Sequence, residues 1–251
     1  LGRQQVYSQS FFASPAMLRR GLTDYAVSAG FERENFTRAS NDYGRGFASA
    51  LYRRGFTDHF TAEARFEAAD DLAGLGVGVS TAAPSVGQID LAIAANRSSE
   101  REGALARASW RGGGRAFSAG VEIEAASAGF MRLGEARDIA GARLTGIANA
   151  GADLGGIGAV TLAFAYAEEA TRAPVETISL SYAPRMAGQG QLYLNALYVT
   201  QEDSYLALSI GFSRPLGIDA SFGARAESDA RGLYAQLSAQ RAPPSDGGFG
   251  W

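Results

Sequence analysis

The chain has 251 residues, of which 46% are hydrophobic, 32 are Gly and only 7 are Pro, a balance that favours many strands joined by turns. The formal net charge of −3, with no basic patch or tail, argues against a nucleic-acid-binding protein. The absence of Cys rules out disulfides and Cys-based metal sites.

Apolar and polar residues alternate through most of the chain, whereas the helical spacing of apolar residues is not sustained anywhere. No run reaches the length of about 18 apolar residues that a membrane helix needs, but membrane barrel strands leave only a weak hydropathy trace. The pattern predicts about fourteen strands of about 8–11 residues. In chain order the strand patterns cover residues 6–12, 25–33, 47–54, 60–67, 75–80, 89–94, 104–111, 117–125, 144–150, 160–166, 177–182, 192–199, 206–213, 218–227 and 233–238.

The strand predicted at residues 60–67 follows a tight turn at residues 54–59 and shows the alternation most clearly. Its apolar residues share one side, namely Phe60, Ala62, Ala64 and Phe66. Its polar residues share the other, namely Thr61, Glu63, Arg65 and Glu67. One irregular stretch, residues 126–141, interrupts the series, and within it residues 130–133 are a candidate short strand.

Two all-β structures fit this alternation. In a soluble sandwich or barrel the apolar face packs a core, whereas in a transmembrane barrel it faces lipid and the polar face lines a lumen. Strands near the 9–11 residues that cross a bilayer favour the membrane barrel, as do aromatic residues near strand ends. The complete absence of Lys on the polar faces points the same way. The predicted fold class is an all-β, antiparallel transmembrane β-barrel segment.

Charged residues on the predicted polar faces are the candidate site residues. As lumen-lining residues they would form a hydrophilic wall, and as cross-strand pairs they would stiffen the sheet, and the two roles are compatible. The candidates are Glu63, Arg65, Glu67, Glu122, Glu124, Asp219, Arg225 and Glu227.

No arrangement of residues predicts an enzyme. His59 is the only histidine and lies in a polar turn, so neither a His-based triad nor a His-rich metal site can form. Glu122 and Glu124 could be imagined as paired acids, but two solvated charges on one strand face explain them better. The run Gly112–Gly114 lacks the following Lys of a phosphate loop. We expect no catalytic residue, cofactor or metal.

A family signature runs in order between Gly2 and Glu63. It consists of Gly2-Arg3-Gln4-Gln5-Val6, Phe11-Phe12-Ala13-Ser14, Leu18-Arg19-Arg20-Gly21-Leu22-Thr23-Asp24-Tyr25, Gly30-Phe31, Asn41-Asp42-Tyr43-Gly44, Tyr52-Arg53-Arg54-Gly55-Phe56-Thr57-Asp58 and Thr61-Ala62-Glu63. This series resembles the outer-membrane ushers of the chaperone–usher pilus pathway. Ushers commonly carry Pro after the Leu-Arg pair, where this chain has Arg20.

The resemblance implies a barrel of roughly two dozen strands, closed by a plug, that exports and assembles pilus subunits by strand addition. By this resemblance residues 1–16 are the end of the plug-like region and a connector, and residues 17–251 are strands of an incomplete barrel, so the chain is expected to be a fragment. The implied partners are pilus subunits, periplasmic chaperone–subunit complexes that bind domains outside this chain, outer-membrane lipid and a second copy in a homodimer. The implied location is the bacterial outer membrane.

Two other functions fit the sequence. A passive diffusion porin or uptake barrel needs a constricting loop, for which only residues 126–141 are long enough. A soluble β-rich adhesin or carbohydrate-binding module needs the apolar face to pack a core.

Overall fold

The computed structural model describes residues 17–33, 41–99, 101–134, 142–169, 173–217, 219–229 and 231–243. These residues form fourteen strands and one short 3₁₀ helix, η1 (Gly155–Ile157), which confirms the all-β prediction. Among the described residues, no helix is long and apolar enough to span a membrane. The strand predicted at residues 6–12 lies outside the described part of the chain.

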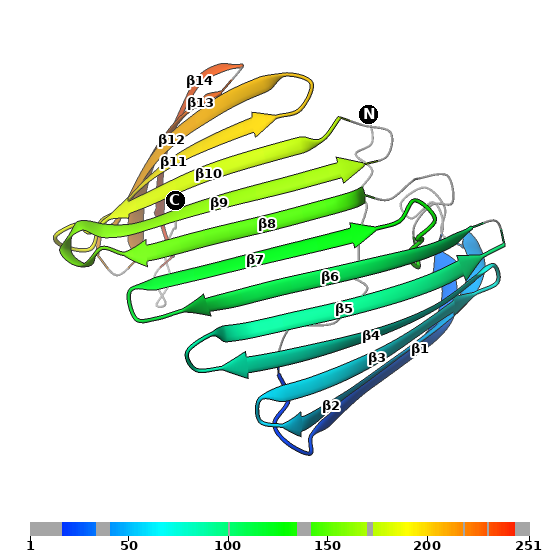
Figure 1. Cartoon of the computed structure of the whole chain (residues 1–251). Coiled ribbons are helices and arrows are strands. Elements are labelled where there is room, and N and C mark those ends of the chain that lie inside the picture. Colours follow the sequence, from blue (N-terminus) through cyan, green and yellow to red (C-terminus); the bar gives the residue numbers. More distant parts are fainter. Residues whose placement is uncertain are drawn as a thin grey trace. The chain divides into compact units, whose positions relative to one another are not determined.

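The strands follow one another along the sheet in chain order, and each is antiparallel to the next where the register is defined (Figure 1). Short connections force this arrangement, because a tight turn can only join antiparallel neighbours. Their bounds are β1 (Thr23–Arg33), β2 (Tyr43–Thr57), β3 (Phe60–Ala69), β4 (Leu72–Ala83), β5 (Gly87–Ser98), β6 (Glu102–Gly113), β7 (Phe117–Ala126), β8 (Ala142–Asp153), β9 (Gly158–Glu169), β10 (Val175–Pro184), β11 (Gln191–Thr200), β12 (Ser204–Pro215), β13 (Ala220–Asp229) and β14 (Gly232–Arg241).

The structure differs from the predicted elements at β2 and at residues 130–133. Strand β2 continues to Thr57, past the predicted end at residue 54, so that only Asp58 and His59 form the turn. The register shifts between Gly55 and Thr57, and a glycine at such an irregularity resembles a turn signal in the sequence. Residues 130–133 are not a strand, because they leave the sheet after β7 and pack against its polar face.

The contacts divide the chain into two compact units. Unit 1 comprises Leu1–Gly112, Glu122–Thr145 and Glu168–Arg172, and unit 2 comprises Gly113–Val121, Gly146–Ala167 and Ala173–Trp251. In each unit one face of the sheet is apolar and the other polar, because successive side chains of a strand point to opposite faces.

Large apolar side chains of both units are exposed. In unit 1 they include Tyr25, which is 75% exposed, and Val27, Phe31, Tyr52, Phe66, Leu75, Val77, Leu91 and Ile93. In unit 2 they include Leu162, Ile178, Leu180, Leu206, Leu208, Ile210, Leu233 and Leu237. Exposing each such side chain to water instead of an apolar medium costs about 1.5–3 kcal/mol. This face therefore fits lipid and argues against a soluble sandwich.

On the opposite face of unit 1, charged side chains are buried. The charged residues Arg53 and Glu67 are 4% and 3% exposed, whereas the buried hydrophobic residues of the described chain are limited to Leu72, Ala94, Leu105 and Phe130. Charged groups are seldom buried unless they are paired. The polar face of unit 1 is consequently where the described chain concentrates its paired charges.

Candidate functional site: the charged face of unit 1

A row of charged residues crosses the polar face of unit 1 from strand to strand. The register places Asp24 of β1 opposite Arg53 of β2, and Arg53 opposite Glu63 of β3. The row continues through Gly78 and Ala92 to Arg107 of β6, which pairs with Glu122 of β7 at 2.8 Å. We call Asp24, Arg53, Glu63, Arg107 and Glu122 the charged row.

Arg53 is the best-buried cation of this row, with a side chain only 5% exposed. Its Nε lies 3.2 Å from Glu63 Oε2 and its Nη1 lies 3.6 Å from Asp24 Oδ2. The side chain of Glu63 is 11% exposed, whereas that of Asp24 is 55% exposed. The pair with Glu63 is therefore poorly screened by water, and the contact with Asp24 is worth less.

Strand β3 also carries Arg65 and Glu67, which are bonded to each other two positions apart at 2.6 Å. Glycines of β4 lie opposite the three charged residues of β3: Gly78 opposite Glu63, Gly76 opposite Arg65 and Gly74 opposite Glu67. Because glycine has no side chain, this column leaves room for the long charged side chains to lie along the sheet. All three predicted residues of β3 share the polar face.

Arg45 of β2 forms a second buried cluster near one end of the strands. Its Nε donates to Glu32 Oε2 at 2.6 Å and its Nη1 donates to Asp71 Oδ1 at 3.0 Å. Its side chain is 6% exposed, so the two carboxylates supply the partners that burial of a guanidinium requires. The candidate residues predicted from the sequence did not include Arg45, Arg53 and Arg107, although their positions in β2 and β6 place them on the polar face.

The predicted pair Glu122 and Glu124 lies on the polar face of β7, and each carboxylate has its own arginine. Glu122 accepts from Arg107, and Glu124 accepts from Arg132, which follows β7. Both carboxylates are engaged by cations, so neither is arranged as a pair of acids around a shared substrate.

Residues 127–134, which follow β7, lie across the polar face and are called the strap. Phe130 is 5% exposed and packs against Ala94 and Leu105, the apolar side chains beneath it. A Cβ added at Gly103 would lie 2.1 Å from the backbone N of Phe130, so only glycine permits this approach. Asn96 of β5 donates its side-chain amide to the carbonyl of Met131. The strap is thus fixed to the face at several points.

The far end of the strap reaches β1, where the backbone N–H of Gly134 donates to Glu32 Oε1 at 3.0 Å. Arg132 contacts β7 and Gly134 contacts β1, although the backbone between these two residues spans about 7 Å at most. Measured along the sheet, β7 and β1 are six strand spacings apart, which is about 29 Å. Even with the side chains included, this bridge requires the polar face of unit 1 to be concave. The strap crosses that concave face.

The chain enters β1 through a turn that folds onto the same face. Leu22 N–H donates to Arg19 O at 3.0 Å, and Gly21 between them has φ 81°. This matches a type II turn, in which glycine suits the third position and Pro is common at the second. Arg20 occupies that second position, where its backbone N–H donates to Asp58 Oδ1 at 3.1 Å. The Pro that ushers commonly carry at this position has no backbone N–H and could not donate this hydrogen bond to Asp58.

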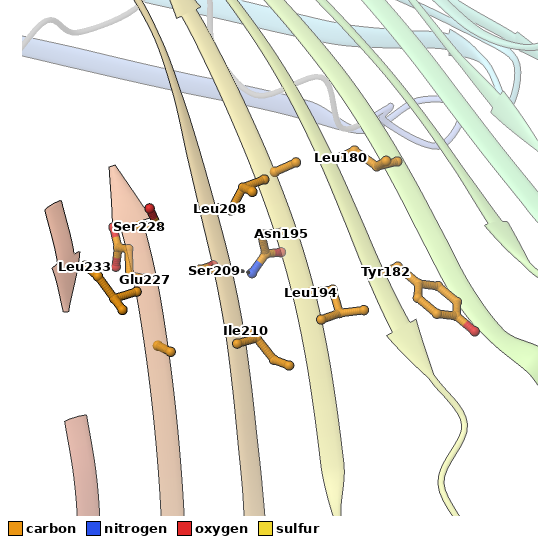
Figure 2. A pocket seen from close by; sticks show the side chains of 12 residues that line it. Leu180, Tyr182, Leu194, Asn195, Leu208, Ser209, Ile210, Glu227, Ser228 and Leu233 are labelled. Carbon is orange, nitrogen blue, oxygen red and sulfur yellow. Dashed lines mark hydrogen bonds between the residues drawn. The ribbon is translucent and has the colours of Figure 1, made fainter. Parts of the chain in front are cut away.

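Unit 2 has a polar face of different composition. A row of polar residues crosses it at Thr161, Ser181, Asn195, Ser209 and Glu227. Figure 2 shows Asn195 and Ser209 on neighbouring strands, joined by a hydrogen bond of 3.2 Å between their side chains. Leu194 and Ile210, which the same view labels, belong to the apolar set of these strands and line an apolar depression of about 480 Å³.

Of the three candidate residues in unit 2, Arg225 and Glu227 lie on the polar face of β13 and pair at 2.5 Å. Asp219 is exposed and lies in the turn before β13, which a 2.7 Å bond from Leu216 N–H to Ala220 O closes. Its placement on that strand was wrong. In the described residues no group of three or more His, Asp or Glu could hold a metal ion.

Comparison with solved structures identifies the fold. The structure of the P pilus usher (PapC) translocation pore matches with a TM-score of 0.68 over 92% of this chain and 50% of that chain, at 12% identity. The fold is that of an outer-membrane β-barrel. It supports the predicted location in the outer membrane, and the chain spans half the length of that usher.

Two further solved structures are less similar. A bacterial polysaccharide outer membrane secretin matches with a TM-score of 0.46 over 88% of this chain and 85% of that chain, at 13% identity. The KdgM porin matches with a TM-score of 0.35 over 77% of this chain and 98% of that chain, at 12% identity. These scores are too low to carry an argument. No protein-family model and no curated protein matches the chain.

Proposed function

We propose that this chain forms part of the wall of an outer-membrane usher, a non-enzymatic pore that exports pilus subunits and assembles them. The subunits would arrive as complexes with a periplasmic chaperone, bound by domains outside this chain. The observation that carries the proposal is a single sheet of fourteen antiparallel strands, apolar and exposed on one face, that matches the P pilus usher pore over 92% of its length.

The contacts made by the signature residues add support. Two separate parts of the signature, Leu18–Gly21 and Gly55–Thr61, touch each other through backbone and side-chain hydrogen bonds. These contacts give the two parts of the signature a common structural role at one junction of this chain.

The polar face suits the passage of a folded protein. Arg53, Arg65 and Arg107 are each within 3.2 Å of a carboxylate of their own wall, so their charge is largely satisfied before a subunit arrives. A subunit moving past such a wall meets neutralised pairs and does not have to break strong contacts with isolated charges. The candidate residues would then line the lumen and stiffen the sheet at once.

A passive diffusion porin is the second candidate, and the strap favours it. A segment that crosses a concave polar face would narrow a lumen, as the constricting loop of a porin must. In that case the strap would define the narrowest point, and small solutes would pass without export of protein.

Deletion of the gene in its native bacterium tests the proposal. Loss of surface fibres, restored by a plasmid-borne copy and seen by electron microscopy, is the expected result. Unchanged fibres with a reduced uptake of small hydrophilic solutes would refute the usher and support the porin. Recovery of the protein as a folded monomer without detergent would refute both.

A further inference from the structure

The polar face of unit 2 carries an exposed aromatic ring that the proposed pore does not use. Tyr193 of β11 lies on this face, because it precedes Leu194 of the apolar set and its register partner is Gly211 of β12. Tyr193 is 38% exposed. An aromatic ring on a face that meets water offers a surface on which an apolar part of a ligand packs.

The ring of Tyr193 lies across the backbone of β12. A Cβ at Gly211 would lie 1.9 Å from Cζ and 2.1 Å from the hydroxyl oxygen of Tyr193, so the ring occupies the space that a side chain at residue 211 would take. Aromatic residues that cover a strand glycine stabilise the sheet, and this role alone would explain the contact. The contact also holds the ring in place before a ligand arrives, which lowers the entropy cost of binding.

Polar side chains on neighbouring strands lie beside the ring. Arg225 of β13 is opposite Gly211 in the register, and it pairs with Glu227 at 2.5 Å. The side chains of this pair are 52% and 37% exposed. Asn195, two positions after Tyr193 on the same face, bonds to Ser209 at 3.2 Å (Figure 2). These groups offer hydrogen-bond donors and acceptors together, and the two charges cancel.

A second exposed tyrosine lies on the other side of the ion pair. Tyr234 of β14 is opposite Glu227 in the register and is 51% exposed. Tyr193 and Tyr234 are three strand spacings apart, which is about 14 Å across the sheet. The strand that carries Arg225 and Glu227 lies between them. Two rings with polar groups between them suit an extended ligand that alternates apolar surfaces with hydrogen-bonding groups.

We propose that Tyr193, Asn195, Arg225, Glu227 and Tyr234 bind a neutral oligosaccharide, and we call these five residues the saccharide site. A sugar ring has a face of C–H groups that packs on an aromatic ring and a rim of hydroxyls that needs both donors and acceptors. A purely apolar ligand would take the ion pair out of water without replacing its hydrogen bonds. The lack of net charge favours a neutral sugar over an acidic one. This binding activity goes beyond the export of pilus subunits and does not depend on it.

Binding is measured on the purified full-length protein in a detergent without a sugar head group, because such a head group would compete for the site. The probes are maltohexaose and the hexamer of N-acetylglucosamine. Polyethylene glycol of similar length is the control ligand, because it has neither rings nor internal hydroxyls. Saturation-transfer NMR during a titration gives the Kd and shows which sugar protons contact the protein.

The variants separate the ring from its position. Tyr193→Ala removes the ring and Tyr193→Phe keeps it. Gly211→Ala displaces the ring without removing it, because the atoms in the way belong to the movable end of the tyrosine side chain. Tyr198→Ala is the matched control, since Tyr198 lies on the same strand and is 42% exposed, but belongs to the apolar face opposite Leu206.

At least one of the two saccharides should bind. Tyr193→Ala and Gly211→Ala should each raise its Kd roughly ten-fold, whereas Tyr193→Phe and Tyr198→Ala should leave the Kd unchanged. If either of the first two variants does not fold, Tyr234→Ala and Arg225→Gln, at exposed side chains, should raise the Kd in the same way.

Three results would overturn the saccharide site. They are no binding of either saccharide, equal binding of polyethylene glycol, and an unchanged Kd in folded Tyr193→Ala protein. A loss of stability in Tyr193→Ala with an unchanged Kd would show that the ring serves only to cover Gly211.

Discussion

The pair between Arg53 and Glu63 gives the sharpest prediction about the charged row. The Arg53→Met substitution removes a guanidinium whose side chain is 5% exposed and leaves Glu63, 11% exposed, without its cation 3.2 Å away. Breaking a buried pair on one side costs about 3–5 kcal/mol, because the remaining charge loses its compensation. The contact with the half-exposed Asp24 adds at most about 1 kcal/mol.

The assay is reversible urea unfolding in lipid vesicles, performed as a double-mutant cycle with Glu63→Met. Each single variant should lose about 3–5 kcal/mol of unfolding free energy, whereas the double variant, which replaces both charges by apolar groups, should lose much less. The Arg97→Met variant is the matched control, because its pair with Glu102 is 80% and 74% exposed. A loss in Arg53→Met no larger than in the control, or a double loss equal to the sum of the single losses, would refute the reasoning.

Three further predictions concern the strap and the apolar face. Phe130→Ala removes the side chain that packs against Ala94 and Leu105. The free energy of unfolding should fall by about 3–5 kcal/mol if the strap stays in place, or by less if the strap detaches. Hydrogen exchange of residues 127–134 distinguishes these two outcomes. Gly103→Ala should expose the same residues to exchange, because its Cβ would lie 2.1 Å from Phe130 N, and unaltered protection would contradict the strap contact. Leu75→Arg places a charge at an apolar side chain that is 60% exposed. The free energy of unfolding in bilayers should fall by about 2–4 kcal/mol for a position near the midplane. An unchanged free energy would mean that this face does not meet lipid.

The alternation in the sequence was enough to predict the fold class and the faces of β3. Phe66 and Glu67 are adjacent in the chain, and the apolar Phe66 is 46% exposed while the charged Glu67 is only 3% exposed. A soluble protein would bury the apolar residue and expose the charged one. The pattern alone gives the two faces of a strand, but the surrounding solvent has to be inferred from strand length and composition.

The cation partners of the candidate carboxylates could not be predicted in the same way. Arg53 meets Glu63 because the register aligns β2 with β3, and Arg107 meets Glu122 because β6 and β7 are neighbours in the sheet. A register depends on turn length, and the turn predicted at residues 54–59 was too long because Gly55 resembled a turn residue.

The strap could not be predicted because its conformation depends on tertiary contacts. The apolar character of Phe130 and Met131 suggested a strand, whereas the structure buries Phe130 on the polar face against Ala94, Leu105 and Gly103. Nothing local in residues 127–134 encodes that partner. Asp219 was misplaced because β12 continues to Pro215 and β13 begins at Ala220, two positions later than the alternation implied.

Accessibility of neighbouring positions on β3 tests the central claim, that the apolar face meets lipid and the charged face lines water. The chain has no native Cys, so single cysteines at Ala64 and Arg65 can be labelled without background. In native outer membranes, the cysteine at residue 64 should be unreactive to a water-soluble thiol reagent. A label attached to it in the lipid phase should be quenched by brominated lipid. The cysteine at residue 65 should react with the water-soluble reagent and escape the lipid quencher, and the reverse result, or no difference between the two positions, would contradict the account.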